Sequence, residues 1–491
     1  MYKQTLTCFF ALLIFTIGFA QEIRLQKGNV TDNVRISDST DATYAVYLPR
    51  DYNVQKPAPV IFLLTPDGSG REAIQMFRRV AEDQYYVIAA SNQKIESDSI
   101  QDGLLQSINF MNGFYRTIKV DPNLLYVAGI NKGAEIASAL PLVNERVSGV
   151  LAINKAWING GIIEKRKKPY VFSAISGTRD YTRFGLLEVV KFLEERDFPT
   201  EVNYFEGGPD SWPDIFTINS AVGKFTLEAM ENGLRKKNDT IINAIFQNEM
   251  MAIENLVKED AYYTAYVQVK KAEDKFKDLD RFDDQLKQLR KSIRKNKTFK
   301  QQRRKWFDLK EEETFQKSDY AHFLEMDMFT NNFENIGWWA KQVDNLKVGK
   351  QQKNVIEKNI AYRLEAYLNL LVNETYKNVI TSEVYIDKKI FISILKTIID
   401  KENPDGYLSI VQLAGHDGDT ETAMLYLEDL LKTGYKDFDK LYEIQGILDL
   451  QMSPEFNLLI EEYGGEAKYI IFDSEKDNES ESPSNKTNIN D

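Results

Sequence analysis

The sequence contains a single cysteine, Cys8, and this residue lies in the N-terminal segment 1–20. That segment has Lys3 near its start, an almost unbroken apolar run and small residues at its end, which is the pattern of a cleaved signal peptide. We therefore expect an exported protein whose mature chain starts at Gln21 and has no thiol, disulfide or thiolate metal ligand. We expect a periplasmic location. The alternatives are the cell surface and secretion into the medium.

Histidine is nearly as scarce as cysteine. The chain has two histidines, His322 and His416, so residues 1–321 contain none. A nucleophilic site of the Ser-His-Asp type needs an imidazole base next to its nucleophile. Such a site could form within the first part of the chain only if the second part donated a histidine to it.

The sequence also lacks an excess of positive charge. It has 62 Lys and Arg against 74 Asp and Glu, a formal net charge of -12, which makes nucleic acid and anionic membrane poor partners. One basic run, residues 291–305, could bind phosphate, but three glutamates follow it at 311–313 in a helix-like segment. We interpret the run as a solvated helical face. We expect no integral membrane segment once the signal peptide is removed.

Short apolar runs alternate with amphipathic stretches from about residue 22 to residue 234. Runs such as "APVIFLLTPDG" and "LLYVAGI" are rich in β-branched and aromatic residues and end at Gly, Asn, Asp or Ser, which predicts strands. Alternating strands and helices predict an α/β domain over residues 21–235, with a mainly parallel sheet covered by helices on both faces. The helix-like segments are residues 71–82, 101–117, 134–143 and 183–197.

Proline becomes rare after residue 235, and no convincing strand follows. Apolar residues recur at helical spacing among Lys and Glu, which predicts an all-helical domain over residues 236–472. Near its end, two helices joined by a Gly-Asp turn place Ala423, Leu427 and Leu430 on one face, as in the unit of a helical-repeat array. A hairpin in an ordinary helical bundle is the alternative. The tail, 473–491, is too polar to bury and is predicted to be disordered.

The turn at residues 129–133, Gly-Ile-Asn-Lys-Gly, follows an apolar strand and opens a helix of small residues. In many hydrolases this context carries a G-x-S-x-G nucleophile elbow. The residue at the tip of such a turn has strained, left-handed backbone, which asparagine tolerates better than most residues. The sequence therefore predicts the geometry of an elbow with Asn131 at the tip.

Residues 44–225 resemble the α/β-hydrolase superfamily, in particular esterases similar to polyhydroxybutyrate depolymerases and feruloyl esterases. Four segments carry the resemblance: "YLPRDYNVQKPAPVIFLLTPDGSG", "VDPNLLYVAGINKGAEIASAL", "SGTRD" and "YFEGGPDSWPD". They match the first strands with the oxyanion loop, the elbow, the acid loop and the histidine loop, in the order that this fold uses. The helical half is similar to tetratricopeptide-like domains.

The resemblance places the nucleophile position at Asn131, next to Lys132, the acid at Asp180, and the histidine near Pro209 or Asp210. Only the acid is retained. Asn131 has no ionisable proton to lose to a base, and its amide nitrogen is not nucleophilic, so no acyl-enzyme can form on it. The resemblance therefore implies a degenerate triad.

The oxyanion loop also departs from the family pattern. Thr65 and Pro66 stand where such hydrolases often have His-Gly, and Pro66 has no backbone N–H to offer. Asp67 and Gly68 could still form a turn that binds something, but an acidic side chain would oppose developing negative charge there. We therefore predict no catalytic residue, no cofactor and no metal.

Two other groupings in this part of the chain have competing interpretations. Asp180, Asp210 and Asp214 could gather near the strand ends and bind a hard cation. Turn and loop chemistry is the interpretation that we prefer for these carboxylates. Ser211 could replace the nucleophile, but nothing near it in the sequence can act as its base.

The helical half contains a group of aromatic residues around Trp338 and Trp339, with Phe333 and Tyr320 nearby. They could form an aromatic contact surface, but packing between helices is the interpretation that we prefer. We interpret His416, near the predicted turn between two helices, as a capping or surface residue.

Together these features predict an exported, non-catalytic, hydrolase-like protein that acts as a scaffold or protein-binding component of the bacterial cell envelope. The helical domain would bind another envelope or exported protein, since helical arrays present extended grooves and fold alone does not guarantee activity. Two alternatives remain open. One is an active exported esterase or peptidase with an unorthodox site, and the other is a carbohydrate or peptide binder that uses the former substrate cleft.

Overall fold

The computed structural model describes residues 25–163 and 168–469, so the predicted signal peptide 1–20 and the predicted tail 473–491 lie outside the described residues. The chain divides into two compact units, Met1–Lys305 and Trp306–Asp491, and each is described by itself. In the described ranges we find no helix with the length and apolar content needed to span a membrane.

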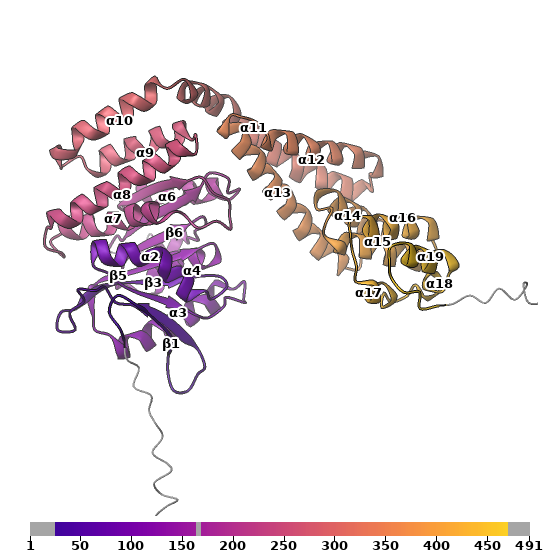
Figure 1. Ribbon diagram of the computed structural model, residues 1–491, viewed down its shortest axis with the longest axis horizontal. Helices are drawn as coiled ribbons and strands as arrows, with labels where there is room; N and C mark the ends of the chain where they lie inside the picture. The colour runs from indigo at the N-terminus through magenta and orange to yellow at the C-terminus, as the bar shows by residue number, and fades with distance from the viewer. Residues whose placement is uncertain (1–24, 164–167, 470–491) are drawn as a thin grey trace, which may run out of the picture. The chain divides into compact units, whose positions relative to one another are not determined.

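The first unit is built on an eight-stranded sheet with the strand order β1-β2-β4-β3-β5-β6-β7-β8 (Figure 1). Strand β2 pairs antiparallel with β1 and β4, and all other neighbours are parallel, which confirms the predicted mainly parallel sheet. The strands are β1 (Val30–Arg35), β2 (Thr43–Tyr47), β3 (Ala58–Leu64), β4 (Val87–Ser91), β5 (Val120–Ile130), β6 (Val147–Ile153), β7 (Val171–Gly177) and β8 (Thr200–Phe205).

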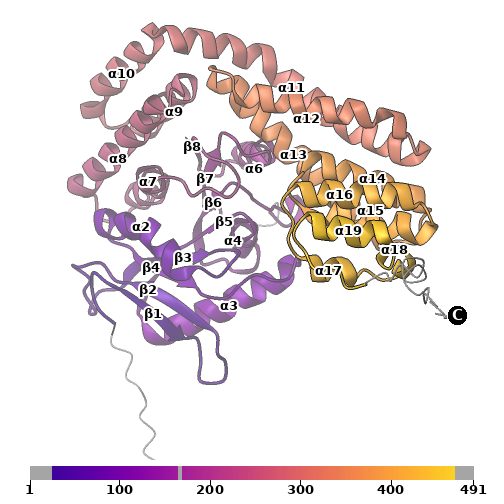
Figure 2. The ribbon, with the colours of Figure 1, turned by 45° about the vertical axis from the view of Figure 1, so that its right-hand side comes forward.

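Helices cover both faces of this sheet, as predicted (Figure 2). One apolar core joins the sheet to α2 (Gly70–Gln84) and α7 (Ile215–Glu231). The other joins it to α3 (Ile100–Thr117), α4 (Lys132–Val143) and α6 (Arg183–Glu194), and a short helix α5 (Gly160–Ile163) precedes β7. Because most strands are parallel, their carboxyl ends lie at one edge of the sheet. The loops that resemble those of hydrolases follow these strand ends.

The first unit continues past residue 235, where the sequence changes from strands to helices. It includes α8 (Asp239–Lys258), α9 (Tyr262–Lys275), η1 (Asp280–Phe282) and α10 (Asp283–Lys295), which Figure 1 shows stacked beyond α7. The reason is a buried ionic cluster, in which Lys275 Nζ lies 2.7 Å from Glu201 Oε1 on β8 and 3.0 Å from Glu249 Oε2 on α8. The first compact unit therefore does not end near residue 235, where the strands give way to helices.

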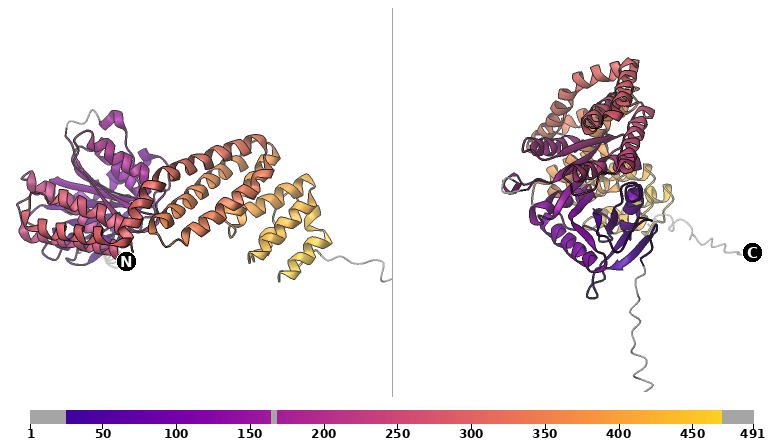
Figure 3. Two further views of the ribbon diagram at one scale, coloured as in Figure 1. Left: turned by 90° about the horizontal axis from the view of Figure 1, so that it is seen from above. Right: turned by 90° about the vertical axis from the view of Figure 1, so that its left-hand side faces the viewer.

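The described residues of the second unit contain helices and turns and no strand. Helix α11 (Lys297–Thr330) leads into it, and neighbouring helices then pack against each other in chain order (Figure 3). The remaining elements are η2 (Phe333–Asn335), α12 (Ile336–Lys350), α13 (Val355–Ile380), α14 (Ile386–Ile399), α15 (Pro404–Asp417), α16 (Thr420–Lys432), α17 (Phe438–Tyr442), α18 (Leu448–Gln451) and α19 (Pro454–Glu462).

The predicted helical hairpin near the end of the chain is confirmed as α15 and α16. Gly418 ends α15 with φ 83°, and the Asp419 side chain accepts a hydrogen bond from the Thr422 N–H at the start of α16. The face of α16 that packs against α15 carries three fully buried residues, Ala423, Leu427 and Leu430. That the array is tetratricopeptide-like stays a prediction.

The aromatic group of the helical unit divides between core and surface. Trp339 and Tyr320 are buried, and Trp339 Nε1 donates a hydrogen bond to Asp327 Oδ2 at 2.8 Å, so packing is confirmed for these two residues. Phe333 is 39% exposed and its ring lies 5.6 Å from that of the buried Phe391, so packing is confirmed for it only in part. His416 is exposed in the last turn of α15, which places it inside the helix rather than in the turn that follows.

The basic run at residues 291–305 covers parts of α10 and α11. Its Lys and Arg side chains are exposed or half-buried, whereas Ile293 and Phe299 are buried. This alternation confirms a solvated helical face with an apolar side.

Candidate functional site

The predicted elbow is present between β5 and α4. Asn131 has φ 51° and ψ -119°, so the predicted positive φ is confirmed, although ψ lies outside the left-handed helical region. A side chain on Gly133 would place its Cβ 2.1 Å from the Leu64 carbonyl oxygen, and one on Gly129 would come within 2.3 Å of Gly133. Both glycines are therefore required by the close approach of β5, α4 and β3.

The side chain of Asn131 binds the loop that resembles a histidine loop. Its Nδ2 donates a hydrogen bond to the Pro209 carbonyl oxygen at 2.8 Å, and Asn154 Nδ2 donates to the same oxygen at 3.0 Å. Asn131 Oδ1 is buried and has no hydrogen-bond partner among the described residues. The structure thus brings together the nucleophile and histidine positions, but it joins them by an amide–carbonyl contact.

Asn154, which the sequence analysis missed, connects the loops of this site. It follows β6, is fully buried and has φ 68°. Its Oδ1 accepts a hydrogen bond from the Gly177 N–H at 3.2 Å, and its carbonyl oxygen accepts one from Thr182 Oγ1 at 3.1 Å. The signal that could have found it is its place at the end of the strand next to the elbow, where ligand-binding residues of parallel sheets collect.

Asp180, at the acid position, is 1% exposed in the loop after β7. Its Oδ1 accepts hydrogen bonds from Thr182 N at 2.8 Å and Thr182 Oγ1 at 2.7 Å, whereas its Oδ2 is buried without a partner among the described residues. Burial raises the pKa of Asp180, the bonds from Thr182 oppose this rise, and the negative charge of Asp210 adds to it. In an intact triad, a histidine N–H would donate to such a carboxylate.

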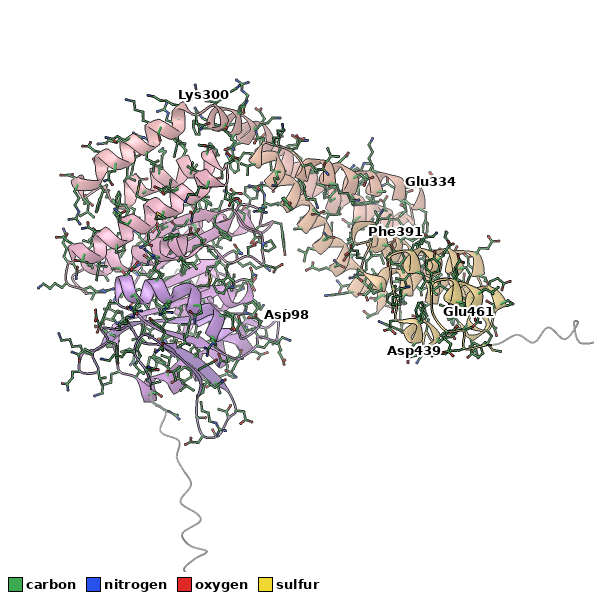
Figure 4. The ribbon with its side chains drawn as sticks, in the orientation of Figure 1. Asp98, Lys300, Glu334, Phe391, Asp439 and Glu461 are labelled. Carbon is green, nitrogen blue, oxygen red and sulfur yellow. The ribbon has the colours of Figure 1, made fainter. Side chains whose placement is uncertain are left out.

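Lys132 is directed to a neighbouring loop and to its own helix. Its Nζ donates to the Asp98 carbonyl oxygen at 2.8 Å and lies 3.3 Å from Glu135 Oε2. Figure 4 labels Asp98, which comes from the loop between β4 and α3. The side chain of Lys132 is therefore occupied in holding that loop to α4.

The predicted oxyanion loop lies only partly at the site. Thr65 reaches α4, since a Cβ on Gly133 would lie 3.2 Å from Thr65 N, but Gly68 lies against the Asn92 carbonyl after β4. Asp67 Oδ1 accepts hydrogen bonds from Ser69 N at 3.2 Å and Ser69 Oγ at 2.7 Å. Burial opposes ionisation of Asp67, but the bonds from Ser69 outweigh it and lower the pKa, so this loop carries a negative charge.

The remaining carboxylates serve local structure. Asp214 Oδ1 caps α7 by accepting hydrogen bonds from Phe216 N at 3.0 Å and Thr217 N at 3.1 Å, which confirms turn and cap chemistry for this residue. Asp210 and Ser211 are exposed, and Ser211 Oγ accepts a hydrogen bond from Gly208 N at 3.3 Å. Within the described ranges no group of three or more His, Cys, Asp and Glu residues is arranged to hold a metal ion.

No family model and no curated protein matches this chain. Among solved structures, it is similar to a ferulic acid esterase, with 15% identity and a TM-score of 0.32 over 41% of this chain and 97% of that chain. It is also similar to an S-formylglutathione hydrolase from Staphylococcus aureus, with 13% identity and a TM-score of 0.32 over 41% of this chain and 97% of the other. A third is Est1E from Butyrivibrio proteoclasticus, with 10% identity and a TM-score of 0.33 over 41% and 99%.

These similar structures are hydrolases, and each likeness covers less than half of this chain. The fold class itself is defined by the strand order, the antiparallel β2, the helices on both faces and the elbow between β5 and α4. The chain is thus an α/β-hydrolase-like domain followed by a helical region.

Proposed function

We propose that the protein is an exported, non-catalytic member of the α/β-hydrolase-like class, which serves as a scaffold or protein-binding component of the bacterial cell envelope. The observation that carries this proposal is the hydrogen bond from Asn131 Nδ2 to the Pro209 carbonyl oxygen, 2.8 Å long. It means that the side chain at the nucleophile position holds the loop at the histidine position in place. Asn131 therefore has a structural role at the elbow and not a chemical one.

Acyl transfer would require three things that this site does not supply. The carboxamide of Asn131 is not a nucleophile, and residues 1–321 contain no histidine to act as a base. Pro66 cannot donate an N–H to an oxyanion, and the ionised Asp67 beside it opposes negative charge. The acid Asp180 alone supports no turnover.

The helical unit is the part of the chain that we assign to partner binding. Its helices pack in chain order from α12 to α16, and such stacks present a continuous surface for another chain. A tetratricopeptide-like array that binds a second exported or envelope protein fits this arrangement. The signal-peptide pattern at residues 1–20 supports export, with the periplasm as the proposed location.

The test is turnover of short-chain esters by the purified mature chain, with an active serine esterase as positive control. We expect no hydrolysis above the uncatalysed rate. The variant Asn131→Ser should also be inactive, because restoring a hydroxyl does not supply a base. Ester turnover by the parent that Asn131→Ala or Asp180→Asn abolishes would contradict the proposal and support the unorthodox esterase or peptidase instead.

A second candidate function is ligand binding without chemistry, and two unused acceptors favour it. Asn131 Oδ1 and Asp180 Oδ2 are buried and have no hydrogen-bond partner within the described residues, so a carbohydrate hydroxyl or a peptide N–H could donate to them. A ligand present at a hundredfold its dissociation constant adds about 2.7 kcal/mol of stability. A thermal shift with glycans or peptides that Asp180→Ala removes would support this function, and no shift with any of them would count against it.

A further inference from the structure

Large apolar side chains are exposed on one part of the helical unit, at the end of α11 and the start of α14. Phe329 is 75% exposed and Tyr385 is 81% exposed, which is unusual for aromatic residues outside an interaction site. We call the whole set the α11–α14 patch: Phe323, Met326, Phe329, Phe333, Val384 and Tyr385. Of this set, only Phe333 belongs to the aromatic group that the sequence indicates as a possible contact surface.

The patch comes from separate segments, and two contacts connect the side formed by α11 and η2 to α14. Phe323, Met326 and Phe329 follow one another at intervals of three residues, which keeps them along one side of α11. Lys388 Nζ, in the first turn of α14, lies 6.0 Å from the Phe329 ring centroid. The rings of Phe333 and Phe391 lie 5.6 Å apart, and Figure 4 labels Phe391 and Glu334 at this end of the unit.

The base of the patch is held by hydrogen bonds to one buried carboxylate. Asp327 Oδ2 accepts hydrogen bonds from Asn335 Nδ2 at 2.6 Å and Trp339 Nε1 at 2.8 Å, and its Oδ1 accepts one from Asn332 Nδ2 at 3.0 Å. Phe323 rests on Trp338 with the ring centroids 4.9 Å apart. The exposed side chains therefore stand on a rigid turn, which lowers the entropic cost of binding.

The charge around the patch is strongly negative. The two segments that form it, residues 318–335 and 381–388, contain one lysine, Lys388, which is half-buried, no arginine and one exposed histidine, His322. Five exposed carboxylates lie in the same segments: Asp319, Glu325, Glu334, Glu383 and Asp387. An apolar centre with an acidic rim complements a binding partner that carries apolar side chains among Lys and Arg.

We propose that the α11–α14 patch binds a positively charged amphipathic segment of a partner protein. This inference rests on the proposed partner-binding function and names the chemistry of the partner. The C-terminal tail of the same chain is polar and acidic, so it does not complement the patch. An anionic membrane would be repelled by the same rim.

The test measures binding of two short designed peptides to the full mature chain by fluorescence anisotropy. One peptide has leucine and lysine at helical spacing, and its twin has glutamate in place of lysine. We expect the lysine peptide to bind at least about tenfold more tightly than the twin at low salt, with an affinity that falls as salt rises. Equal affinity for the two peptides overturns the proposal.

Matched variants then locate the binding. The double variant F329S/Y385S should weaken the lysine peptide by about tenfold or more, since exposed aromatic anchors dominate such interfaces. Leu458→Ser, which removes a side chain that is 65% exposed on α19, should leave the affinity unchanged. The double variant D319K/E325K should reduce the preference for the lysine peptide, because it leaves three of the five exposed carboxylates and adds two lysines. Unchanged binding by F329S/Y385S overturns the assignment of the patch.

Three further outcomes distinguish this inference from the proposed function. If the parent chain dimerises in sedimentation velocity and F329S/Y385S is monomeric, a second copy occupies the patch and the inference is overturned. If partners crosslinked to the helical unit in cells persist in F329S/Y385S, the inference fails while the proposed partner-binding function stands. Ester turnover by the parent would contradict only the non-catalytic part of the proposal.

Discussion

At the scale of single residues, Asp180 stands where the resemblance to hydrolases places the acid, in a part of the chain that contains no histidine. Burial raises its pKa above 3.8, the ordinary value for an aspartate, so the ionised carboxylate is disfavoured in the folded protein. The fold therefore binds this proton more tightly than the unfolded chain does. Stability from Asp180 is fully present below pH 3.8 and is lost as the pH rises from there through the folded pKa.

Asp180→Asn removes this dependence on pH. We expect the free energy of unfolding of the variant, taken relative to the parent, to increase as the pH rises from about 3.8 toward neutrality. Urea unfolding at a series of pH values measures it. Parallel pH profiles for the parent and the variant would show that the carboxyl of Asp180 has the same pKa in the folded and unfolded chains.

The side chain of Asn131 stabilises the fold through its hydrogen bond to the Pro209 carbonyl oxygen. Asn131→Ala removes the hydrogen bond to Pro209 and leaves an alanine at φ 51°, a backbone conformation that alanine tolerates less well than asparagine. We therefore expect the free energy of unfolding to fall by about 1–3 kcal/mol. Asn131→Gly, which relieves the backbone but also loses the bond, should lose less. An alanine variant as stable as the parent in urea would contradict a structural role for this side chain.

The sequence predicts part of this site. Asn131 and Asp180 stand in local motifs, a glycine turn after a strand and a short loop after the next strand but one, so their positions could be predicted from neighbours in the chain. The place of Asn154 at a strand end could also be predicted, but its role could not, because that role depends on contacts with Gly177, Thr182 and Pro209, which only the folded sheet brings to it. Periodicity carries no information about such contacts.

At the scale of secondary-structure elements, α8 and α9 are fixed to the sheet by a buried ionic cluster. Lys275 Nζ contacts Glu201, Glu249 and the Ser220 carbonyl oxygen, the last at 2.7 Å. Burial opposes the charge on Lys275, but the two carboxylates outweigh it and raise its pKa. Because each charge is removed from water, the cluster is stabilising only while it is complete.

Lys275→Met leaves two carboxylates buried without a cation. We expect it to lower the free energy of unfolding by about 3–5 kcal/mol, as measured by chemical denaturation. Lys287→Met is the matched control, because Lys287 pairs with Asp283 on the exposed surface of α10 and should change stability little. Equal effects of the two substitutions would be inconsistent with a buried cluster that holds the helices to the sheet.

An element could be predicted from the sequence where its apolar residues follow a clear helical or strand spacing. The α15–α16 hairpin was predicted because its apolar residues share one face. Strand β1 was not predicted, because "VTDNVR" has one buried residue, Val34, and lacks an apolar alternation. The spacing in α8 and α9 shows which face is buried but not what covers it, so their packing against the sheet could not be predicted.

At the scale of the whole molecule, the first compact unit needs more chain than its strands do. A fragment of residues 21–235 would expose Glu201 and Asn203 on β8, which α8 and α9 cover in the full chain. We expect this fragment to melt at a clearly lower temperature than a fragment of residues 21–305, or to aggregate. Circular dichroism melts compare the two. A cooperative melt at the same temperature would show that α8 to α10 are dispensable for the fold.

We propose that the hydrolase-like domain is not a serine hydrolase. The most direct measurement is the intact mass of the mature chain after incubation with a serine-directed fluorophosphonate, with an active serine esterase in parallel. We expect an unchanged mass for this protein, because residues 1–321 contain no histidine that could act as the base for a nucleophilic serine. A mass increase of one phosphonyl group, located on a single serine by peptide mapping, would contradict it.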